Sequence, residues 1–169
     1  MLIRCTGKLQ KEMGLKKTEL KEDEANFSYL GSWHANLILI DRKKCVLFCN
    51  DKTLFSFIVP GISRTDIKKL EQIFKEWLQC VLADEELPRS VIEAIISEYS
   101  EINYAKTNNK SVLGSMNDLA YHYKYAILEA GGVNSYEVPG IIRRLNRLPM
   151  GALKYSNAIN TLKSLYNKA

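Results

Sequence analysis

The sequence predicts an α+β domain in which an N-terminal antiparallel β-meander packs against a C-terminal set of four to five helices. Two observations carry this prediction. Apolar runs typical of strands, separated by short polar turns, fill the chain up to residue 60, and apolar residues at helical spacing dominate it from residue 63. With 169 residues, 46% of them hydrophobic, the chain can bury a sizeable core. We therefore expect residues 1–169 to form a single domain, sheet-rich over 1–60 and helical over 63–169.

The N-terminal part is expected to begin with a short strand over residues 1–6. Thr6 then caps a short helix, which Gly14 closes in the left-handed conformation that glycine favours. The charged stretch 16–26 has little apolar content and indicates an exposed loop. The nearly continuous apolar character of the next runs indicates a sheet covered on both faces. The three predicted strands of the meander span residues 35–40, 45–50 and 53–59.

Helical spacing dominates the rest of the chain. The first helix follows Ser63 and Asp66, which form an S-x-x-D capping pattern. Pro88 suits the first turn of the second helix, and a third begins at about Ser111 or Ser115 and ends at about residue 130. The remaining predicted elements are a short strand over 102–105, a short basic helix over 141–145 and a last helix over 151–166.

Composition and charge limit the classes of function. No apolar run is long enough to span a bilayer, and the first residues lack the pattern of a signal peptide, so we expect a soluble cytoplasmic protein. The four cysteines lack the close spacing of zinc ligands and indicate reduced thiols, with no metal or cofactor expected. The net charge of +5 divides into +3 over residues 1–63, −4 over 64–101 and +6 over 102–169. This basic C-terminal third favours nucleic acid or an acidic protein as partner, or merely solvates the surface.

A first candidate site lies at the entrance of the first long strand. In the alternation of a strand, Ser32, His34 and Asn36 share one face, while Trp33 lies on the other. Three polar side chains in a row indicate a ligand-binding edge, at which His34 is suited to act as a general base near neutral pH. The alternative is a histidine satisfied by backbone groups at the end of the sheet.

A second candidate is the polar stretch 106–118, which opens the third helix. The free backbone N–H groups and the positive dipole end of a helix N-terminus suit an anion, and two lysines add charge. Ser115 and Asp118 also form an S-x-x-D cap, so capping alone is the alternative reading. The candidate contacts in this stretch are Lys106, Asn108, Asn109, Lys110, Ser115 and Asn117.

A third candidate is the basic segment 142–155. Leu148 and Pro149 faintly resemble the hairpin of the helix-hairpin-helix DNA-binding motif, but Gly151 is out of register with it. Basic side chains here are suited to contact phosphates without sequence specificity. The alternative is a structural pair of helices with a basic solvent face. The candidate contacts are Arg143, Arg144, Arg147 and Lys154.

Six segments of the sequence together resemble a family of small bacterial proteins known only as a domain of unknown function. They are residues 2–6, 31–37, 50–55, 106–109, 114–118 and 149–153. The resemblance spans nearly the whole chain and implies a single bacterial cytoplasmic domain. It brings no activity, cofactor or catalytic residue with it.

Three functional hypotheses follow from these patterns. The favoured one is a non-catalytic binding module that engages nucleic acid or an acidic partner through the basic C-terminal third. The second is a small-ligand-binding protein or enzyme whose site brings His34 and Asn36 together with the 106–118 stretch. The third is an interaction protein of a toxin–antitoxin or phage-defence system. The second hypothesis requires that the sheet edge and the start of the third helix border one cleft.

Overall fold

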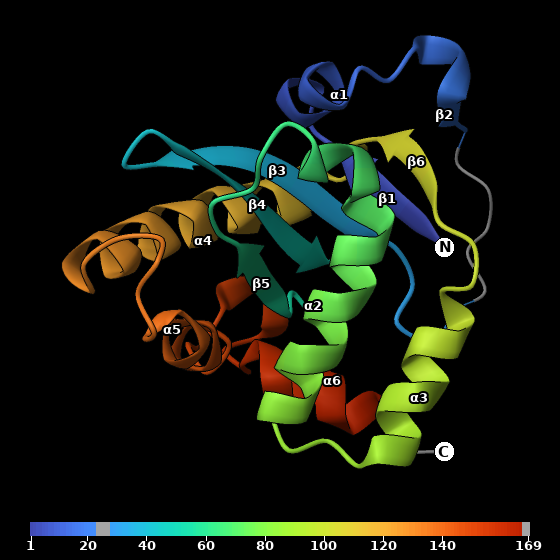
Figure 1. Ribbon diagram of the computed structural model, residues 1–169. Helices are drawn as coiled ribbons and strands as arrows, with labels where there is room; N and C mark the ends of the chain where they lie inside the picture. The colour runs from blue at the N-terminus through green and yellow to red at the C-terminus, as the bar shows by residue number, and fades with distance from the viewer. Residues whose placement is uncertain (23–27, 167–169) are drawn as a thin grey trace.

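A single mixed sheet organises the computed structural model, which describes residues 1–22 and 28–166 (Figure 1). Its strands are β1 (Leu2–Cys5), β2 (Leu20–Lys21), β3 (Trp33–Ile40), β4 (Lys43–Asn50), β5 (Ser56–Val59) and β6 (Asn103–Lys106). They lie in the order β2-β6-β1-β3-β4-β5. From β2 to β3 neighbouring strands run parallel, and from β3 to β5 they run antiparallel.

The α+β class is therefore confirmed, but the simple N-terminal meander is wrong. Only β3, β4 and β5 form the predicted meander, whereas β1 pairs in parallel with both β3 and β6. Alternation within a short run identifies a strand but not its partner, and parallel partners are separated by long crossovers. Within the predicted loop 16–26, a 3₁₀ turn (Lys17–Glu19) and β2 are ordered, while residues 23–26 lie outside the described residues.

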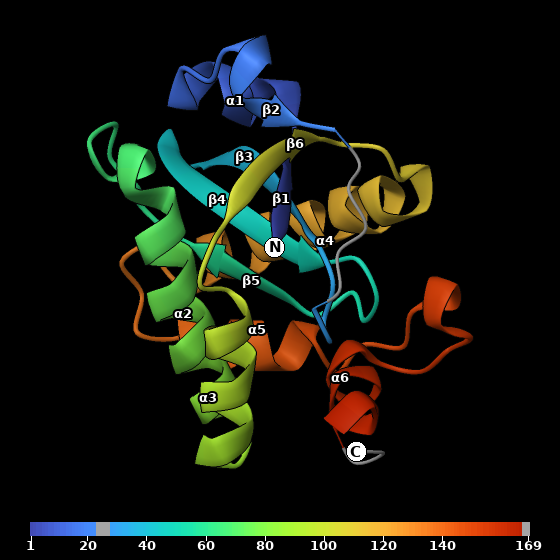
Figure 2. The ribbon, with the colours of Figure 1, turned by 90° about the vertical axis from the view of Figure 1, so that its right-hand side faces the viewer.

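Helices cover both faces of this sheet (Figures 1 and 2). On one face Phe74 of the second helix packs against Trp33 and Phe57, and on the other Tyr123 of the fourth helix bonds to Ser56. These aromatic contacts bury the apolar sides of the strands, as the continuous apolar runs predict. The helices are α1 (Gly7–Met13), α2 (Leu70–Asp84), α3 (Arg89–Glu98), α4 (Lys110–Glu129), α5 (Val138–Leu145) and α6 (Ala158–Tyr166).

Several helix ends follow the sequence signals. Gly14 ends α1 with φ +73°, and Ser63 and Asp66 exchange hydrogen bonds ahead of α2. The bonds from Ser63 hold the pKa of the Asp66 carboxyl below its usual range. Thr6, in contrast, does not cap α1 with its side chain, because its hydroxyl donates to Asn36 Oδ1 across the sheet at 3.0 Å.

The predicted start of the third helix at about Ser111 agrees with α4, whereas the alternative start at Ser115 is wrong, and so is the start of the last predicted helix. The N-cap of α4 is Asn109, so Ser115 and Asp118 lie inside the helix rather than at its start. The predicted helix over 151–166 is broken, because Lys154 and Tyr155 adopt φ of +53° and +65° and only α6 continues beyond them. Neither residue is a glycine, so the sequence carried no signal for this left-handed turn.

Three of the four cysteines are buried. Cys5, Cys45 and Cys49 lie in the sheet, as expected for small hydrophobic side chains, whereas Cys80 on α2 is exposed. Within residues 1–22 and 28–166, no three histidine, cysteine or acidic side chains gather into a group able to hold a metal ion. In the same residues, no helix is both long and apolar enough to cross a membrane.

Thiol reactivity provides a direct test of this arrangement. Burial raises the pKa of the Cys5 thiol to about 12 and also raises those of Cys45 and Cys49, so all three remain protonated thiols in the folded state. At about pH 8, we expect a disulfide reagent to modify one thiol of the native protein rapidly and the other three only on unfolding. Cys80→Ser should abolish the rapid phase. Rapid modification of a second thiol would show that the sheet is open.

Candidate functional site

The turn between β4 and β5 is fixed by a buried asparagine. Asn50 donates from Nδ2 to the carbonyl oxygens of Leu30 and Ser32, at 3.0 and 3.3 Å. Its Oδ1 accepts from the backbone N–H and the hydroxyl of Thr53, at 3.0 and 2.9 Å. The backbone N–H of Asp51 also donates to the Ser32 carbonyl. Since every polar atom of the asparagine side chain is bonded, the position of Asp51 in this turn is well defined.

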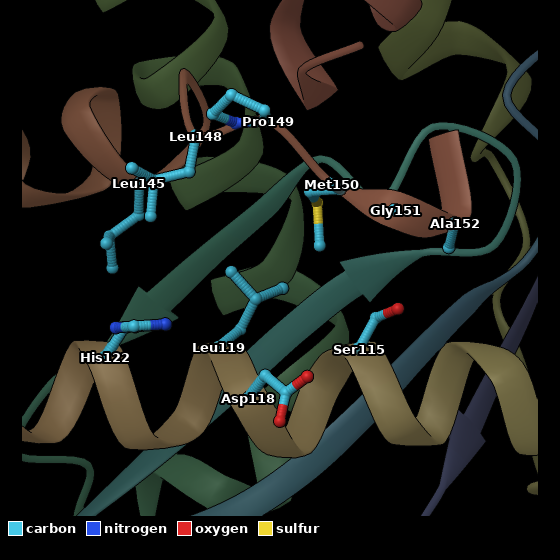
Figure 3. A pocket seen from close by; sticks show the side chains of 10 residues that line it. All are labelled: Ser115, Asp118, Leu119, His122, Leu145, Leu148, Pro149, Met150, Gly151 and Ala152. Carbon is cyan, nitrogen blue, oxygen red and sulfur yellow. The ribbon is translucent and has the colours of Figure 1, made fainter. Parts of the chain in front are cut away.

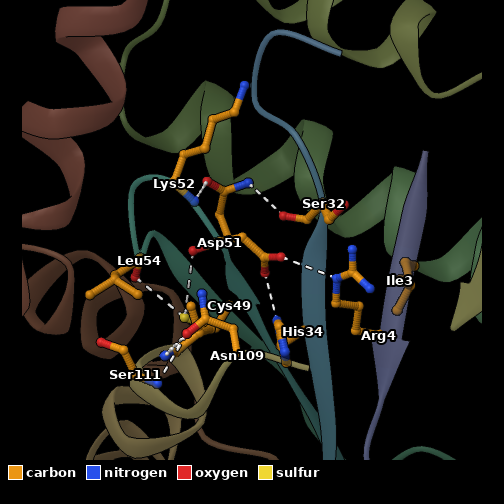
Figure 4. A network of polar contacts seen from close by, with 12 residues as sticks. Ile3, Arg4, Ser32, His34, Cys49, Asp51, Lys52, Leu54, Asn109 and Ser111 are labelled. Carbon is orange, nitrogen blue, oxygen red and sulfur yellow. Dashed lines mark hydrogen bonds and ion pairs between the residues drawn. The ribbon is translucent and has the colours of Figure 1, made fainter. Parts of the chain in front are cut away.

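Asp51 joins two strands of the sheet through a charged network (Figure 4). Its Oδ1 accepts a hydrogen bond from His34 Nδ1 at 2.6 Å, and its Oδ2 lies 3.5 Å from Nε of Arg4. Arg4 and His34 are direct register partners on β1 and β3, so their side chains leave the same face of the sheet. The carboxylate between them fixes the orientation of both side chains. We call Arg4, His34 and Asp51 the charged network.

The charged network is largely shielded from water. The His34 side chain is fully buried, and those of Arg4 and Asp51 are 10% and 17% exposed. Charged groups are rarely buried without a partner, because desolvation costs several kcal/mol. Among the described residues, none offers a hydrogen-bond partner to His34 Nε2. The burial of His34 and its bond to the Asp51 carboxylate favour a positioning role over direct proton transfer to a ligand.

A basic pocket opens next to the charged network. It has a volume of about 310 Å³, and the described part of its lining holds four cationic side chains against one carboxylate. Arg4 and Lys21 are both register partners of Ala105 on β6, which places the three side chains on one face of adjacent strands. We call this cavity the Arg4 pocket. It is lined by Arg4, Lys17, Leu20, Lys21, Glu22, Ala105, Lys106, Thr107 and Asn108.

The start of α4 contributes to the Arg4 pocket through its preceding loop rather than through its N–H groups. Asn109 Oδ1 accepts from the N–H groups of Ser111 and Val112, at 3.0 and 3.2 Å. These donors are thus already capped, by Asn109 rather than by the Ser115 and Asp118 pair that the sequence suggested. Lys106 and Asn108 line the pocket just before the helix.

The sequence matches a family model over nearly its whole length. One model, described as Domain of unknown function (DUF6933), matches residues 2–161. The chain belongs to this family. The matched range contains the whole charged network and every residue of the Arg4 pocket. A comparison with curated proteins finds no match.

The family range also contains the other predicted site residues, which the fold disperses. Asn36 accepts from Thr6, and the carbonyl of Ser32 accepts from Asn50. Ser115 lines a different cavity, on the side of α4 that faces the loop after α5, and Asn117 is exposed. Lys110, at the first position of α4, is exposed and lines neither cavity. Of the predicted ligand residues, the structure therefore brings only Lys106 and Asn108 to the Arg4 pocket.

The basic cluster of the C-terminal third is engaged within the chain. Arg147 donates to both carboxylate oxygens of Glu85, at 2.9 and 2.7 Å, and this bond raises the pKa of the guanidinium. Arg143 lies 3.7 Å from a carboxylate oxygen of Asp84. The acidic middle and the basic end of the sequence thus neutralise each other here. Net charges summed over segments of the sequence do not reveal these ion pairs.

The same segment departs from a helix-hairpin-helix. The helix α5 ends at Leu145 and α6 begins at Ala158, so a twelve-residue loop with a 3₁₀ turn replaces the short hairpin between them. Arg144 and Lys154 remain exposed on this side of the molecule. They are the members of the predicted cluster that the intramolecular ion pairs leave available for an external phosphate.

Arg4 and Asp51 were missed as functional residues, although each carries a weak signal. Arg4 is the one charged residue of an otherwise apolar strand, and a charge at such a position is uncommon unless it is paired. Asp51 follows a strand directly and reads as a turn residue. Their association depends on segments far apart in the sequence, which no local pattern connects.

Proposed function

We propose that this protein binds a small anionic ligand, with a phosphate or carboxylate group, in the Arg4 pocket. The observation that carries the proposal is the nearly buried guanidinium of Arg4 in the wall of a pocket lined by three lysines. The N–H donors of a guanidinium have the geometry to form paired hydrogen bonds with phosphate and carboxylate oxygens. The lysines add electrostatic attraction that depends little on orientation. Among the described residues of the lining, Glu22 is the single opposing charge.

The orientation of Arg4 supports this function. Asp51 engages Nε, and His34 in turn fixes the position of the Asp51 carboxylate. A side chain that is already ordered loses less conformational entropy when a ligand binds, so binding is tighter for the same contacts. In the proposed function His34 and Asp51 are positioning residues, and Arg4 contacts the ligand.

The size of the pocket favours a small molecule over a polymer. Its volume of about 310 Å³ is at the lower end of the range for small-molecule sites, roughly 300 to 1,000 Å³. The prediction that nucleic acid or an acidic protein binds the C-terminal third rests on net charge, and two of its three arginines pair with Asp84 and Glu85. For this reason we place the anion at the Arg4 pocket rather than on that surface.

Charge reversal at the rim of the pocket tests the proposal. Lys21 and Lys106 are exposed, so Lys21→Glu with Lys106→Glu should leave the fold intact. We expect calorimetry at low ionic strength to detect binding of inorganic pyrophosphate to the wild type, weakened at least about tenfold in the double variant.

The matched control has the same net charge. Lys68→Glu with Lys124→Glu changes two other exposed lysines, on the 3₁₀ turn before α2 and on α4, and should bind pyrophosphate as the wild type does. If both double variants bound pyrophosphate equally weakly, the loss would come from net charge alone, and the assignment to the Arg4 pocket would be overturned. Absence of binding to the wild type by pyrophosphate, inorganic phosphate and citrate alike would overturn the function itself.

A further inference from the structure

A second cavity lies between α4 and the loop that follows α5 (Figure 3). Its volume is about 340 Å³, and it shares no lining residue with the Arg4 pocket. Ser115 and Leu119 of α4 point toward the loop, Asp118 lies on the near side of the helix, and the Met150 side chain descends toward the helix (Figure 3). The lining consists of Ser115, Asp118, Leu119, His122, Leu145, Leu148, Pro149, Met150, Gly151 and Ala152.

The polar side chains of this cavity all come from one wall. Ser115, Asp118 and His122 follow one another at spacings of three and four residues, which places them on one side of α4. Within residues 1–22 and 28–166, their side chains make no hydrogen bond or ion pair, although His122 contacts the ring of Tyr121. Their acceptor and donor atoms are therefore available to a ligand.

The opposite wall is apolar and held in shape by its backbone. Pro149 and Asn157 form an antiparallel bridge, and the Met150 N–H donates to the Ser156 carbonyl at 3.0 Å. The Met150 carbonyl accepts from the N–H of Tyr155, whose left-handed conformation closes the loop. Left-handed backbone at consecutive non-glycine residues costs free energy and is concentrated at functional sites. The cavity is therefore formed before any ligand arrives.

The charge of this cavity is opposite to that of the Arg4 pocket. Of the residues that the structure describes, Asp118 is the one carboxylate in the lining, and no lysine or arginine is among them. We propose that the cavity binds a small organic cation, an amine with an apolar body, whose ammonium group pairs with the Asp118 carboxylate. The leucines and Met150 then cover the apolar body, and the flexible thioether side chain adapts to its shape. An anion is disfavoured by the same carboxylate.

Three ligands of equal length distinguish the contribution of the charge: hexylamine, hexan-1-ol and hexanoate. The probe is the methyl signal of Met150 in protein labelled at its methionine methyl groups, assigned by its loss in Met150→Leu. We expect hexylamine to shift this signal saturably and with the highest affinity of the three. The comparison uses the wild-type protein, so it does not depend on the folding of any variant.

Asp118→Asn is expected to weaken hexylamine binding about fivefold and to leave hexan-1-ol unaffected, since only the charge pair is lost. Glu129→Gln removes an exposed carboxylate from the same helix outside the cavity and should change neither affinity. Hexan-1-ol binding as tightly as hexylamine, a Met150 signal that no ligand moves, or equal effects of the two variants would each overturn the proposal. None of these results bears on anion binding at the Arg4 pocket.

Discussion

Replacing Asp51 with alanine is expected to lower the free energy of unfolding by about 3 kcal/mol. The change removes the carboxylate that Arg4 Nε faces and leaves the His34 Nδ1–H donor, in a fully buried ring, without its acceptor. Breaking a buried ion pair costs about 3 to 5 kcal/mol, and the partial exposure of Asp51 places this case at the lower end. Urea unfolding followed by circular dichroism measures the difference.

Two further variants separate charge from hydrogen bonding at this position. Asp51→Asn retains an acceptor for His34 but loses the charge that faces Arg4, so its stability should fall between wild type and Asp51→Ala. Glu93→Ala removes the carboxylate of an ion pair on the surface, between side chains that are 91% and 62% exposed, and should have little effect. If Asp51→Ala were no more destabilising than Glu93→Ala, the charged network would not stabilise the fold.

Phe74→Ala should have the largest effect on stability, about 4 kcal/mol. Phe74 is fully buried on α2, and its ring contacts four other aromatic rings at centroid distances from 5.1 to 5.9 Å. Alanine leaves a cavity among these rings and removes their edge and face contacts. The four rings are those of Trp33, Phe48, Phe57 and Tyr99.

The unfolding transition of the Phe74 variants checks this expectation. Phe74→Leu retains most of the volume and should cost much less than Phe74→Ala, while Tyr125→Ala on the exposed side of α4 should cost little. The denaturant dependence of the unfolding free energy should stay unchanged in all three. A small effect of Phe74→Ala would falsify the packing of α2 on this face of the sheet. Because Phe74 lies outside the Arg4 pocket, Phe74→Leu should still bind pyrophosphate.

Local periodicity predicted the elements that pack by local rules. The three antiparallel strands and the apolar face of α2 agree with the prediction, although the third strand begins at Ser56 rather than at residue 53, since pleat alternation and helical spacing each depend on neighbours in the sequence. The parallel pairing of β1 with β6 brings together segments about a hundred residues apart. No pattern within either short strand encodes that partner, so the sheet was predicted smaller than it is.

The candidate site was predicted in part for the same reason. The three polar residues that alternate along its strand point to His34, and the polar loop ahead of a helix points to Lys106 and Asn108. Arg4 and Asp51 belong to segments with the pattern of a strand and of a turn. The parallel register of β1 and β3 brings Arg4 to His34, whereas the antiparallel pairing of β3 with β4 brings Asp51 there. The net charge of the C-terminal third follows from the sequence alone, but its ion pairs with the acidic middle depend on the fold.

The Arg4 side chain itself offers the most direct test of anion binding. In protein labelled with ¹⁵N, the Arg4 Nε–H signal can be assigned by its loss in Arg4→Lys and followed while pyrophosphate is added. We expect this signal to shift saturably together with the backbone amides of Lys106 and Asn108, while the signals of Arg144 and Lys154 stay in place. Shifts confined to Arg144 and Lys154, with Arg4 unmoved, would contradict the account and return the anion to the basic C-terminal third.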